Sequence, residues 1–421
     1  MIRELIITAA LFVFLASYLC YARRTGTYIN ALTPRLLLEV PLFYILEIAY
    51  LHYTDMPPAS VTAYLYIYAC YALGNLVTTY VLIRVRIPEP AIACCSSGYR
   101  IRFFPYLLML AAYLLYLPIL IAFWEHLLSP RMIYVLTRTG YGVSYFFSTT
   151  LAYLSFILLL FRPPAFRGER QLFFILCTLL AFLHGSKAQV VTFVFIWMLH
   201  AVYIGARRTS FRRFGIATAV FAFGLSTLFY SFTIGIKPSD MFKLLSYYSD
   251  YSRNAMIVID DDYPTKFGQM TLEDNLWSRI PRAVMPLKPK DFGSFALSAH
   301  YFPFQFQDDA GAAAFGLGTP YADFKQFAVV AIVVWSAVSA WLLKLFILRT
   351  ERNRHPADFI MLLFFAGIGL IPIGVGYLLP EHLLLALFLL IVLRLELRCS
   401  TRTSTASNRP PATPAAISGA P

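Results

Sequence analysis

Long apolar runs recur along the whole chain, separated by short polar connections. At about 1.5 Å per residue, runs of this length are comparable with the roughly 30 Å hydrocarbon core of a bilayer. Long apolar runs separated by short polar connections therefore predict an all-α polytopic transmembrane bundle. We predict eleven spans, near residues 5–21, 36–53, 60–83, 105–123, 142–161, 171–186, 188–206, 214–235, 326–348, 358–379 and 382–397.

Composition supports this fold class. The chain of 421 residues is 59% hydrophobic and only 14% charged, with a mean hydropathy of +0.65, whereas an average soluble protein carries about 25% charged residues. Aromatic residues make up 17%, which suits lipid contact and the aromatic belts at membrane interfaces. A water-soluble, collagen-like, disordered or disulfide-stapled chain is excluded.

The placement of cations predicts the topology. Basic clusters follow every second span, and the positive-inside rule assigns such loops to the cytoplasm. The N-terminus is therefore expected outside and the C-terminus inside, in the cytoplasm. These clusters contain Arg23, Arg24 and Arg35; Arg84, Arg86, Arg100 and Arg102; Arg162, Arg167 and Arg170; Arg207, Arg208, Arg212 and Arg213; and Lys344, Arg349, Arg352 and Arg354.

The spans divide the chain into four parts. We expect transmembrane spans 1–8 over residues 1–235, one large extracytoplasmic loop containing short helices over 236–325, and spans 9–11 over 326–398. Residues 399–421 are rich in Ser, Thr, Pro and Ala and are expected to form a disordered cytoplasmic tail.

The large loop is the part in which function is expected, because structureless loops of such length are uncommon. Its first part, from Asp240 to Ile259, has apolar residues at helical spacing, which predicts a helix lying on the membrane surface. The residues of this apolar face are Met241, Leu244, Leu245, Tyr248, Tyr251 and Ala255.

The middle of the loop interleaves four cations with three prolines between Trp277 and Lys290. Proline stiffens the backbone and prevents a helix, so the cations are held close together. Arginine binds phosphate oxygens in bidentate fashion and lysine adds a point charge, which predicts an anion site. The alternative is a set of surface cations that contact lipid headgroups.

Several segments resemble one family. Arg279-Ile-Pro-Arg282 with Pro286-Leu-Lys288-Pro289, and Gly316-Leu-Gly-Thr-Pro-Tyr321-Ala-Asp-Phe324 before the next span, resemble the large periplasmic loop of Wzy-type O-antigen and capsular repeat-unit polymerases. The number of spans and the turn His184-Gly-Ser-Lys187 are similar too, although an Arg is more usual at position 187.

The resemblance implies a GT-C-like glycosyltransferase of the bacterial inner membrane, which joins oligosaccharide repeat units carried on undecaprenyl pyrophosphate. It implies no cofactor, no metal and no nucleic acid. The implied partners are the lipid-linked oligosaccharide, membrane lipid and a chain-length regulator protein.

The same chemistry assigns roles to individual residues. A base must deprotonate the acceptor hydroxyl, and cations must stabilise the departing pyrophosphate. We expect His300 as the base, with Glu381-His382 and Asp308-Asp309 as alternatives, and Arg279 and Arg282 as the pyrophosphate-binding pair. Further contacts to pyrophosphate or glycan are expected from Lys187, Lys288, Lys290, Arg253 and Tyr321. For Lys187 the alternative is a lysine that snorkels at a helix end.

Acidic residues offer two further interpretations. The run Asp260-Asp261-Asp262 is typical of a metal site or, as we prefer, of a hydrated turn. Glu39 and Glu47 are eight residues apart within one span, so both are expected to face the bundle interior with partners. They are either structural carboxylates or part of a phosphate or proton path.

Three other functions remain open from the sequence. An O-antigen ligase would use a similar donor and fold. A flippase for lipid-linked oligosaccharide would place its cations along the spans, whereas this chain concentrates them in one loop. A membrane scaffold without enzymatic activity is the third.

Overall fold

The computed structural model describes residues 1–53, 58–88, 103–136, 141–205, 250–277, 280, 285–307, 315–367 and 380–392. All the regular secondary structure in these ranges is helical, which confirms the predicted all-α class. A bundle in lipid must satisfy every backbone polar group internally, and helices do so within one segment.

The membrane bundle is built from long and short helices. These helices are α1 (Ile2–Thr25), α2 (Thr33–Glu39), the π-helical segment η1 (Val40–Ile45), α3 (Leu46–Tyr53), α4 (Val61–Arg84), α5 (Phe104–Ala122), the short η2 (Trp124–His126), α6 (Pro130–Leu136), α7 (Gly142–Leu160), α8 (Glu169–Leu183), α9 (Lys187–Tyr203), α17 (Ala328–Asn353), α18 (Pro356–Gly367) and α19 (Pro380–Val392). The large loop forms α12 (Asp250–Asp260), α13 (Gln269–Trp277), α14 (Ser294–Tyr301), α15 (Pro303–Gln307), α16 (Gly318–Phe324) and η5 (Lys325–Phe327).

Each predicted span in the described ranges coincides with helical structure, although the second, 36–53, consists of α2, η1 and α3 in succession. Five helices are long and apolar enough to cross a membrane: α1, α4, α5, α7 and the continuous segment Gly318–Asn353, which contains α17. Within the described residues, the apolar parts of α9, α18 and α19 are shorter than these five, with 10–17 residues each. The chain is therefore a multi-pass membrane protein. The count of eleven remains a prediction, since the expected span 214–235 and the second half of 358–379 lie outside the described residues.

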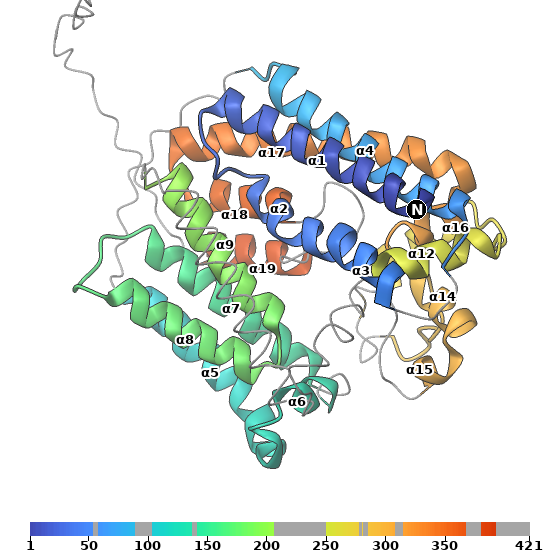
Figure 1. Cartoon of the computed structure of the whole chain (residues 1–421). Helices are drawn as coiled ribbons and strands as arrows, with labels where there is room; N and C mark the ends of the chain where they lie inside the picture. Colours follow the sequence, from blue (N-terminus) through green and yellow to red (C-terminus); the bar gives the residue numbers. More distant parts are fainter. Residues whose placement is uncertain are drawn as a thin grey trace, which may run out of the picture.

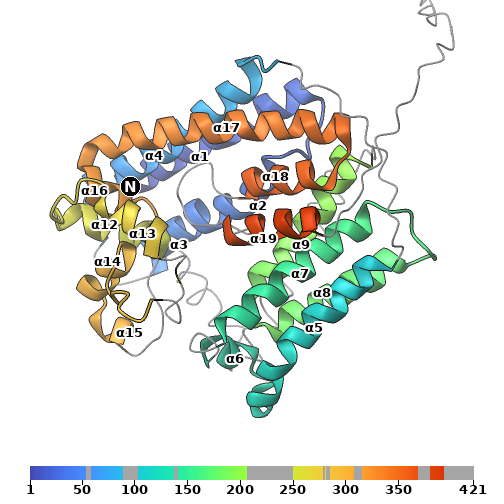
Figure 2. The same ribbon diagram turned by 180° about the vertical axis from the view of Figure 1, so that it is seen from behind.

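The helices form two groups. In Figure 1, α1, α4 and α17 lie side by side along one edge of the molecule, and α5, α7, α8 and α9 form a second group. Helices α2, α18 and α19 lie between these groups, as the reverse view in Figure 2 also shows. The loop helices gather at one end of the first group and form what we call the cap, α12–α16.

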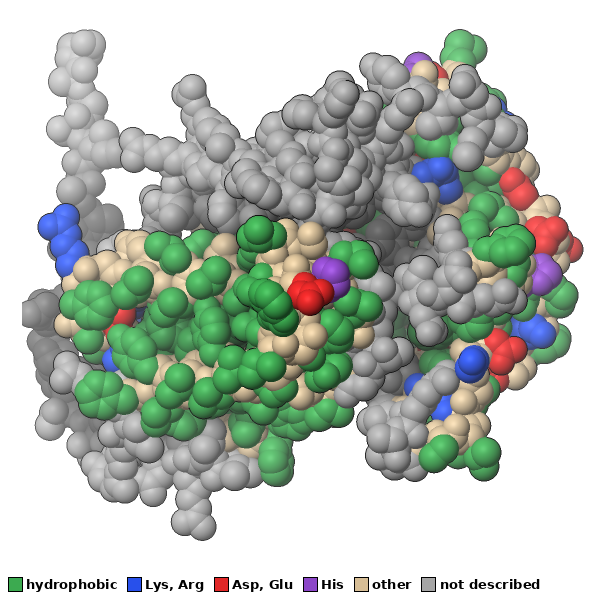
Figure 3. All heavy atoms as spheres, turned by 90° about the horizontal axis from the view of Figure 1, so that it is seen from below, with side chains coloured by type: hydrophobic (Ala, Val, Ile, Leu, Met, Phe, Trp, Pro, Cys, Tyr) green, Lys and Arg blue, Asp and Glu red, His purple; other side chains and the backbone are tan. Residues whose placement is uncertain are grey.

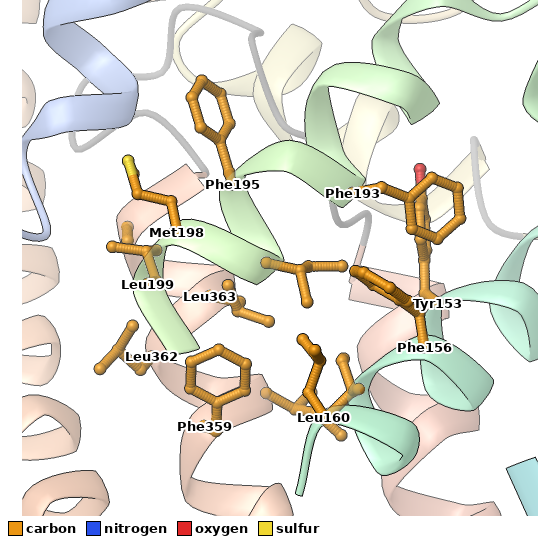
Figure 4. Packing of buried hydrophobic residues seen from close by; sticks show 14 of the residues in the cluster. Tyr153, Phe156, Leu160, Phe193, Phe195, Met198, Leu199, Phe359, Leu362 and Leu363 are labelled. Atoms are coloured by element: carbon orange, nitrogen blue, oxygen red, sulfur yellow. The ribbon is translucent and has the colours of Figure 1, made fainter. Parts of the chain in front are cut away.

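Two hydrophobic cores hold the helices together. The larger core joins α5, α7, α8, α9, α18 and α19, and it also takes in one end of α1, α4 and α17 through residues such as Tyr21, Leu82 and Leu343. Figure 4 shows part of it, where Phe156 and Phe193 meet edge to face with ring centroids 5.5 Å apart. The smaller core joins α1, η1 and α4 to the cap through residues such as Tyr68, Ala255 and Leu317. The cap is thus part of the folded body of the first group.

Connections that the charge pattern assigns to one side of the membrane lie at one end of the first group. At the end with the cap, Arg3 Nε donates to the carbonyl of Ala59 over 2.9 Å. At the opposite end, Lys344 Nζ donates to the carbonyl of Val85 over 2.6 Å. The relative sidedness of these connections agrees with the prediction, whereas the absolute orientation of the termini remains a prediction.

Both carboxylates of the second span are buried and partnered, as expected for residues that face the bundle interior. Glu39 accepts two hydrogen bonds from Arg35, over 2.7 and 3.1 Å. Glu47 accepts one from the hydroxyl of Tyr64 over 2.6 Å. Between the two carboxylates Pro41 interrupts the regular ladder, and the backbone makes a wide turn in which Leu46 N–H donates to the Pro41 carbonyl.

Two of the cations expected in cytoplasmic clusters are buried instead of exposed to water: Arg35, which pairs with Glu39, and Arg162. Arg162 is buried and forms an ion pair with Glu169 at the start of α8. Glu169 also accepts the backbone N–H of Ala165 over 2.6 Å and the hydroxyl of Tyr106. Arg162 therefore stabilises the turn between α7 and α8 and is not exposed to water.

Candidate functional site

The first cap helix, α12, lies against the bundle. Its apolar face, including Ala255, Met256 and Val258, is buried and packs on α16 and α4. The backbones of α12 and α16 approach so closely that a Cβ at Gly318 would lie 2.9 Å from Ala255 Cα. The predicted helix is thus confirmed for residues 250–260. Ala255, the one residue of the predicted apolar face whose side chain is described, is covered by protein, and the place of the rest of this face at the membrane surface stays a prediction. Residues 240–249 lie outside the described residues.

A buried carboxylate joins α16 to α13. Asp323 accepts hydrogen bonds from the backbone N–H groups of Met270 and Thr271, over 3.0 and 2.8 Å, and from the Thr271 hydroxyl over 2.5 Å. The first N–H groups of a helix have no partner within it, and a carboxylate there also suits the helix dipole. Asp323 therefore fixes where α13 begins.

The three consecutive acids at the end of α12 interact with residues from three different parts of the fold. Asp260 accepts the backbone N–H of Ser60 over 2.8 Å, at the start of α4. Asp261 accepts the hydroxyl of Tyr301 over 3.0 Å, at the end of α14. Asp262 pairs with Lys325 over 2.5 Å, at the junction to α17. The run does form a turn, but the interpretation as a merely hydrated turn was incomplete.

His300 lies beside this acidic turn. Its Nε2 is 3.8 Å from Asp261 Oδ2, and its ring meets those of Tyr263 and Tyr301 edge on, with centroids 5.4 and 4.7 Å apart. Burial and the nearby Asp261 carboxylate raise the pKa of Tyr301, so its hydroxyl stays protonated and donates to Asp261. The exposed imidazole is thus oriented by two rings and faces a carboxylate, an arrangement suited to a base.

The loop between α13 and α14 is fixed by two acids of α13. Asp274 accepts the backbone N–H of Ser294 over 2.9 Å, and Glu273 accepts that of Gly293 over 2.8 Å. Gly293 has φ 52°, and a Cβ there would lie only 2.2 Å from Asp274 Oδ1, so only glycine fits. Burial raises the pKa of Asp274.

Part of the cation and proline segment can be described. Lys288 donates to the carbonyl of Ile280 over 3.1 Å, and its ammonium lies 4.7 Å from the centroid of the Phe292 ring, so it folds the segment back on itself. Lys290 is exposed. Arg279 and Arg282 lie outside the described residues, and their expected role stays a prediction.

Two other candidates lie deeper in the cap. The guanidinium of Arg253 stacks on the ring of Tyr50, 3.7 Å from its centroid. The Tyr321 ring is buried against Tyr66, with centroids 5.1 Å apart. Both therefore contribute to the joint between cap and bundle, and a ligand could reach only a part of either side chain.

The α8–α9 turn belongs to the other helix group. Ser186 N–H donates to the Ala181 carbonyl and Gly185 N–H to that of Phe182, with Gly185 at φ 65°, which is the Schellman arrangement that ends a helix. Lys187 opens α9 directly afterwards. The side chain of Lys187 lies outside the described residues, so the structure gives only the position of its backbone, at the start of α9.

A buried polar network supports this turn. His184 Nδ1 donates to Gln189 Oε1 over 2.7 Å, and its Nε2 lies 3.0 Å from Ser148 Oγ on α7. The Gln189 amide donates to the Tyr145 hydroxyl and to Thr149 Oγ1, both over 3.1 Å. His184 is fully buried, and these hydrogen bonds hold its ring between α7 and the start of α9.

The alternative bases are less accessible or lie outside the described residues. His382 is buried in α19, stacked on Phe146 with centroids 4.5 Å apart, and its Nδ1 lies 2.5 Å from Thr150 Oγ1. It lies in the first turn of α19, which begins at Pro380, and is only 7% exposed. The Glu381 side chain and Asp308-Asp309 lie outside the described residues. Within the described part of the chain, no three His, Cys, Asp or Glu residues are grouped as metal ligands would be.

Sequence reasoning missed the residues that build the cap. Asp323, Glu273 and Asp274 were not singled out, although a helix start close to acidic residues is a known capping signal. Their partners come from distant parts of the loop, and no local pattern identifies them. What the structure brings together is His300, the acidic turn and Lys325, above the ends of α1, α3, α4 and α17.

These features define a class: a polytopic α-helical membrane protein whose long late loop folds into a cap at one end of the bundle. Comparison with curated proteins gives the family. The chain is 34% identical over 381 residues to the O-antigen polymerase of Salmonella typhimurium strain LT2, covering 89% of this chain and 91% of the relative, and the O-antigen polymerase of Salmonella typhi matches equally. The chain therefore belongs to the O-antigen polymerase family. No family model and no solved structure matches it.

Proposed function

We propose that this protein joins lipid-linked oligosaccharide repeat units into an O-antigen type polysaccharide at the periplasmic face of the inner membrane. The observation that carries the proposal is the 34% identity to the Salmonella O-antigen polymerases along 89% of the chain. The cap adds support, since it gathers a histidine, carboxylates and cations at one end of the bundle.

The reaction follows from this chemistry. The hydroxyl of an acceptor sugar attacks the anomeric carbon of the donor, a new glycosidic bond forms, and the bond from that carbon to the pyrophosphate oxygen breaks. His300 takes the hydroxyl proton, and Asp261 stabilises the imidazolium that results. The lipid keeps the pyrophosphate as it leaves.

Cations of the chain stabilise the charge that develops on the leaving group. Arg279 and Arg282 bind the pyrophosphate oxygens, with Lys290 and Lys187 as further contacts, since guanidinium groups match such oxygens in bidentate fashion. Lys288 keeps these cations together by closing their loop on Ile280. The proposal needs no metal ion and places a chain-length regulator as a partner.

The test uses a strain from which the gene has been deleted, complemented with variants at equal protein level. With the wild type, a gel of surface glycan should show a ladder of long chains. Arg282→Ala should leave a single repeat unit on the lipid core, whereas Asp291→Ala, an exposed control, should keep the ladder. Bare core in the deletion strain would indicate a ligase instead, and a persisting ladder with Arg282→Ala would refute the role of that arginine.

A further inference from the structure

The cap carries an exposed apolar surface that the proposed reaction does not use. We define the cap strip as Phe267, Leu272, Leu276, Phe324 and Phe327. Phe267 is 86% exposed, Leu272 68% and Phe327 78%. Large apolar side chains that cluster in this way on a surface mark an interaction site.

The members of the cap strip are neighbours. The Phe324 ring lies 3.1 Å from the position that a Cβ on Gly268 would take, next to Phe267. Leu272 N–H donates to the Gly268 carbonyl over 3.0 Å, so Leu272 is one helical turn further along α13, and Leu276 is one turn beyond it. The strip therefore runs from the start of α17 onto α13.

The cap strip continues an exposed face of α17. From Phe327 onward, exposed apolar side chains recur at intervals of three and four residues, which places them on one side of the helix. These residues are Val330, Val334, Val338 and Trp341. Since α17 belongs to a membrane-crossing segment, this face is turned to lipid, and the cap strip extends it beyond the end of the helix. Figure 3 shows the wider division: charged side chains gather at the end with the cap, and hydrophobic ones cover the other lobe.

The length of α17 points to the same surroundings. No charged residue occurs between Lys325 and Lys344, and Phe327 to Lys344 covers about 26 Å at 1.5 Å per residue. The hydrocarbon core is about 30 Å thick. The uncharged part of α17 is therefore a few Å shorter than the hydrocarbon core. The remaining thickness lies at the level of Phe324 and Phe267, which belong to the cap.

From this continuity we infer that the cap strip is immersed in the outer leaflet of the membrane. The cap is then held at the membrane by two contacts, its joint with α4 and its own insertion among lipids, with Lys266 next to Phe267 at headgroup level. The elements that lie at the membrane surface are then α13 and the start of α17.

The test measures the depth of single spin labels in the full chain in phosphatidylethanolamine–phosphatidylglycerol nanodiscs. Labels are attached at Leu272→Cys and, independently, Phe267→Cys, after replacement of the six native cysteines. Val334→Cys is the control in lipid and Asp291→Cys the control in water, both on exposed residues. Variants are compared only where thermal unfolding matches that of the cysteine-free chain.

At Leu272 and Phe267 the collision rate with oxygen, relative to that with a water-soluble nickel complex, should be several-fold higher than at Asp291 and approach that at Val334. A ratio equal to that at Asp291 would overturn the inference, because the strip would then face water. Low collision rates with both reagents would overturn it too, since protein would cover the strip.

Discussion

The carboxylate of Asp260 accepts both the backbone N–H and the hydroxyl of Ser60, over 2.8 and 2.5 Å, although the two residues are 200 positions apart. Ser60 Oγ in turn accepts the N–H of Ala63 over 3.0 Å, which is the N-cap of α4. Asp260, at the end of α12, thereby orients Ser60, the N-cap residue of the membrane helix α4. The cap is fastened to the bundle at this point.

Asp260→Ala should lower the free energy of unfolding by about 1 kcal/mol, because it removes a partner of an N-cap serine. The measurement is thermal unfolding of the purified protein in detergent. Asp260→Asn keeps an acceptor oxygen and should lose less. Equal unfolding of Asp260→Ala and the wild type would mean that water replaces this contact at no cost.

Asp323→Ala should have a larger effect. The residue is fully buried, and its removal leaves the N–H groups of Met270 and Thr271 without their acceptor, at a cost of about 3 kcal/mol in total. The cap should open more often, so limited proteolysis between Asp261 and Asp323 should accelerate, while Asp291→Ala digests as the wild type does. An unchanged digestion rate would contradict the capping role.

The raised pKa of Asp274 makes a prediction about pH. Burial favours the protonated acid in the folded chain, so this group contributes stability below its ordinary pKa of 3.8, and that contribution is lost as pH rises through the raised value. Asp274→Asn keeps an acceptor for Ser294 and does not titrate. Unfolding of the variant and the wild type should therefore be compared from pH 3.5 upward. The variant should gain in relative stability as pH rises, and a constant difference would contradict the assignment.

Gln189→Leu tests the network beneath the α8–α9 turn. It leaves the Nδ1–H of buried His184 without its acceptor, which costs about 1–3 kcal/mol. Thermal unfolding should shift downward by a few °C, whereas Ala188→Ser on the exposed side of the same turn should unfold like the wild type. If the Gln189 variant matched this control, the amide would not be needed to hold the turn.

The bundle helices were predictable because lipid leaves the backbone few choices. An apolar run that crosses a bilayer must be helical, so α1 and α17 lie close to the predicted ranges 5–21 and 326–348. The cap was predictable only in part. The spacing of apolar residues shows that one face of α12 is hydrophobic, but it does not reveal whether lipid or protein covers that face.

The candidate site, too, was predictable from the sequence only in part. His300 could be chosen from its residue type and its place in the loop, whereas its carboxylate neighbour Asp261 and the rings of Tyr263 and Tyr301 are brought to it by folding. Pairings such as Asp323 with Thr271 join residues 52 positions apart, and neither residue type nor periodicity encodes such pairings.

The wide turn at Val40–Ile45 accommodates one residue more than a regular helix would hold. A π-helical turn is equivalent to one residue inserted into an α-helix, and the wider turn absorbs that residue, so the helix on either side keeps its direction. Deleting one residue there would close the turn to regular geometry and would leave both Glu39 and Glu47 beside their partners. A deletion within the α-helical stretch that follows would instead rotate what lies beyond it by about 100°, so this turn is the one place in the second span where chain length can change without moving a buried acid.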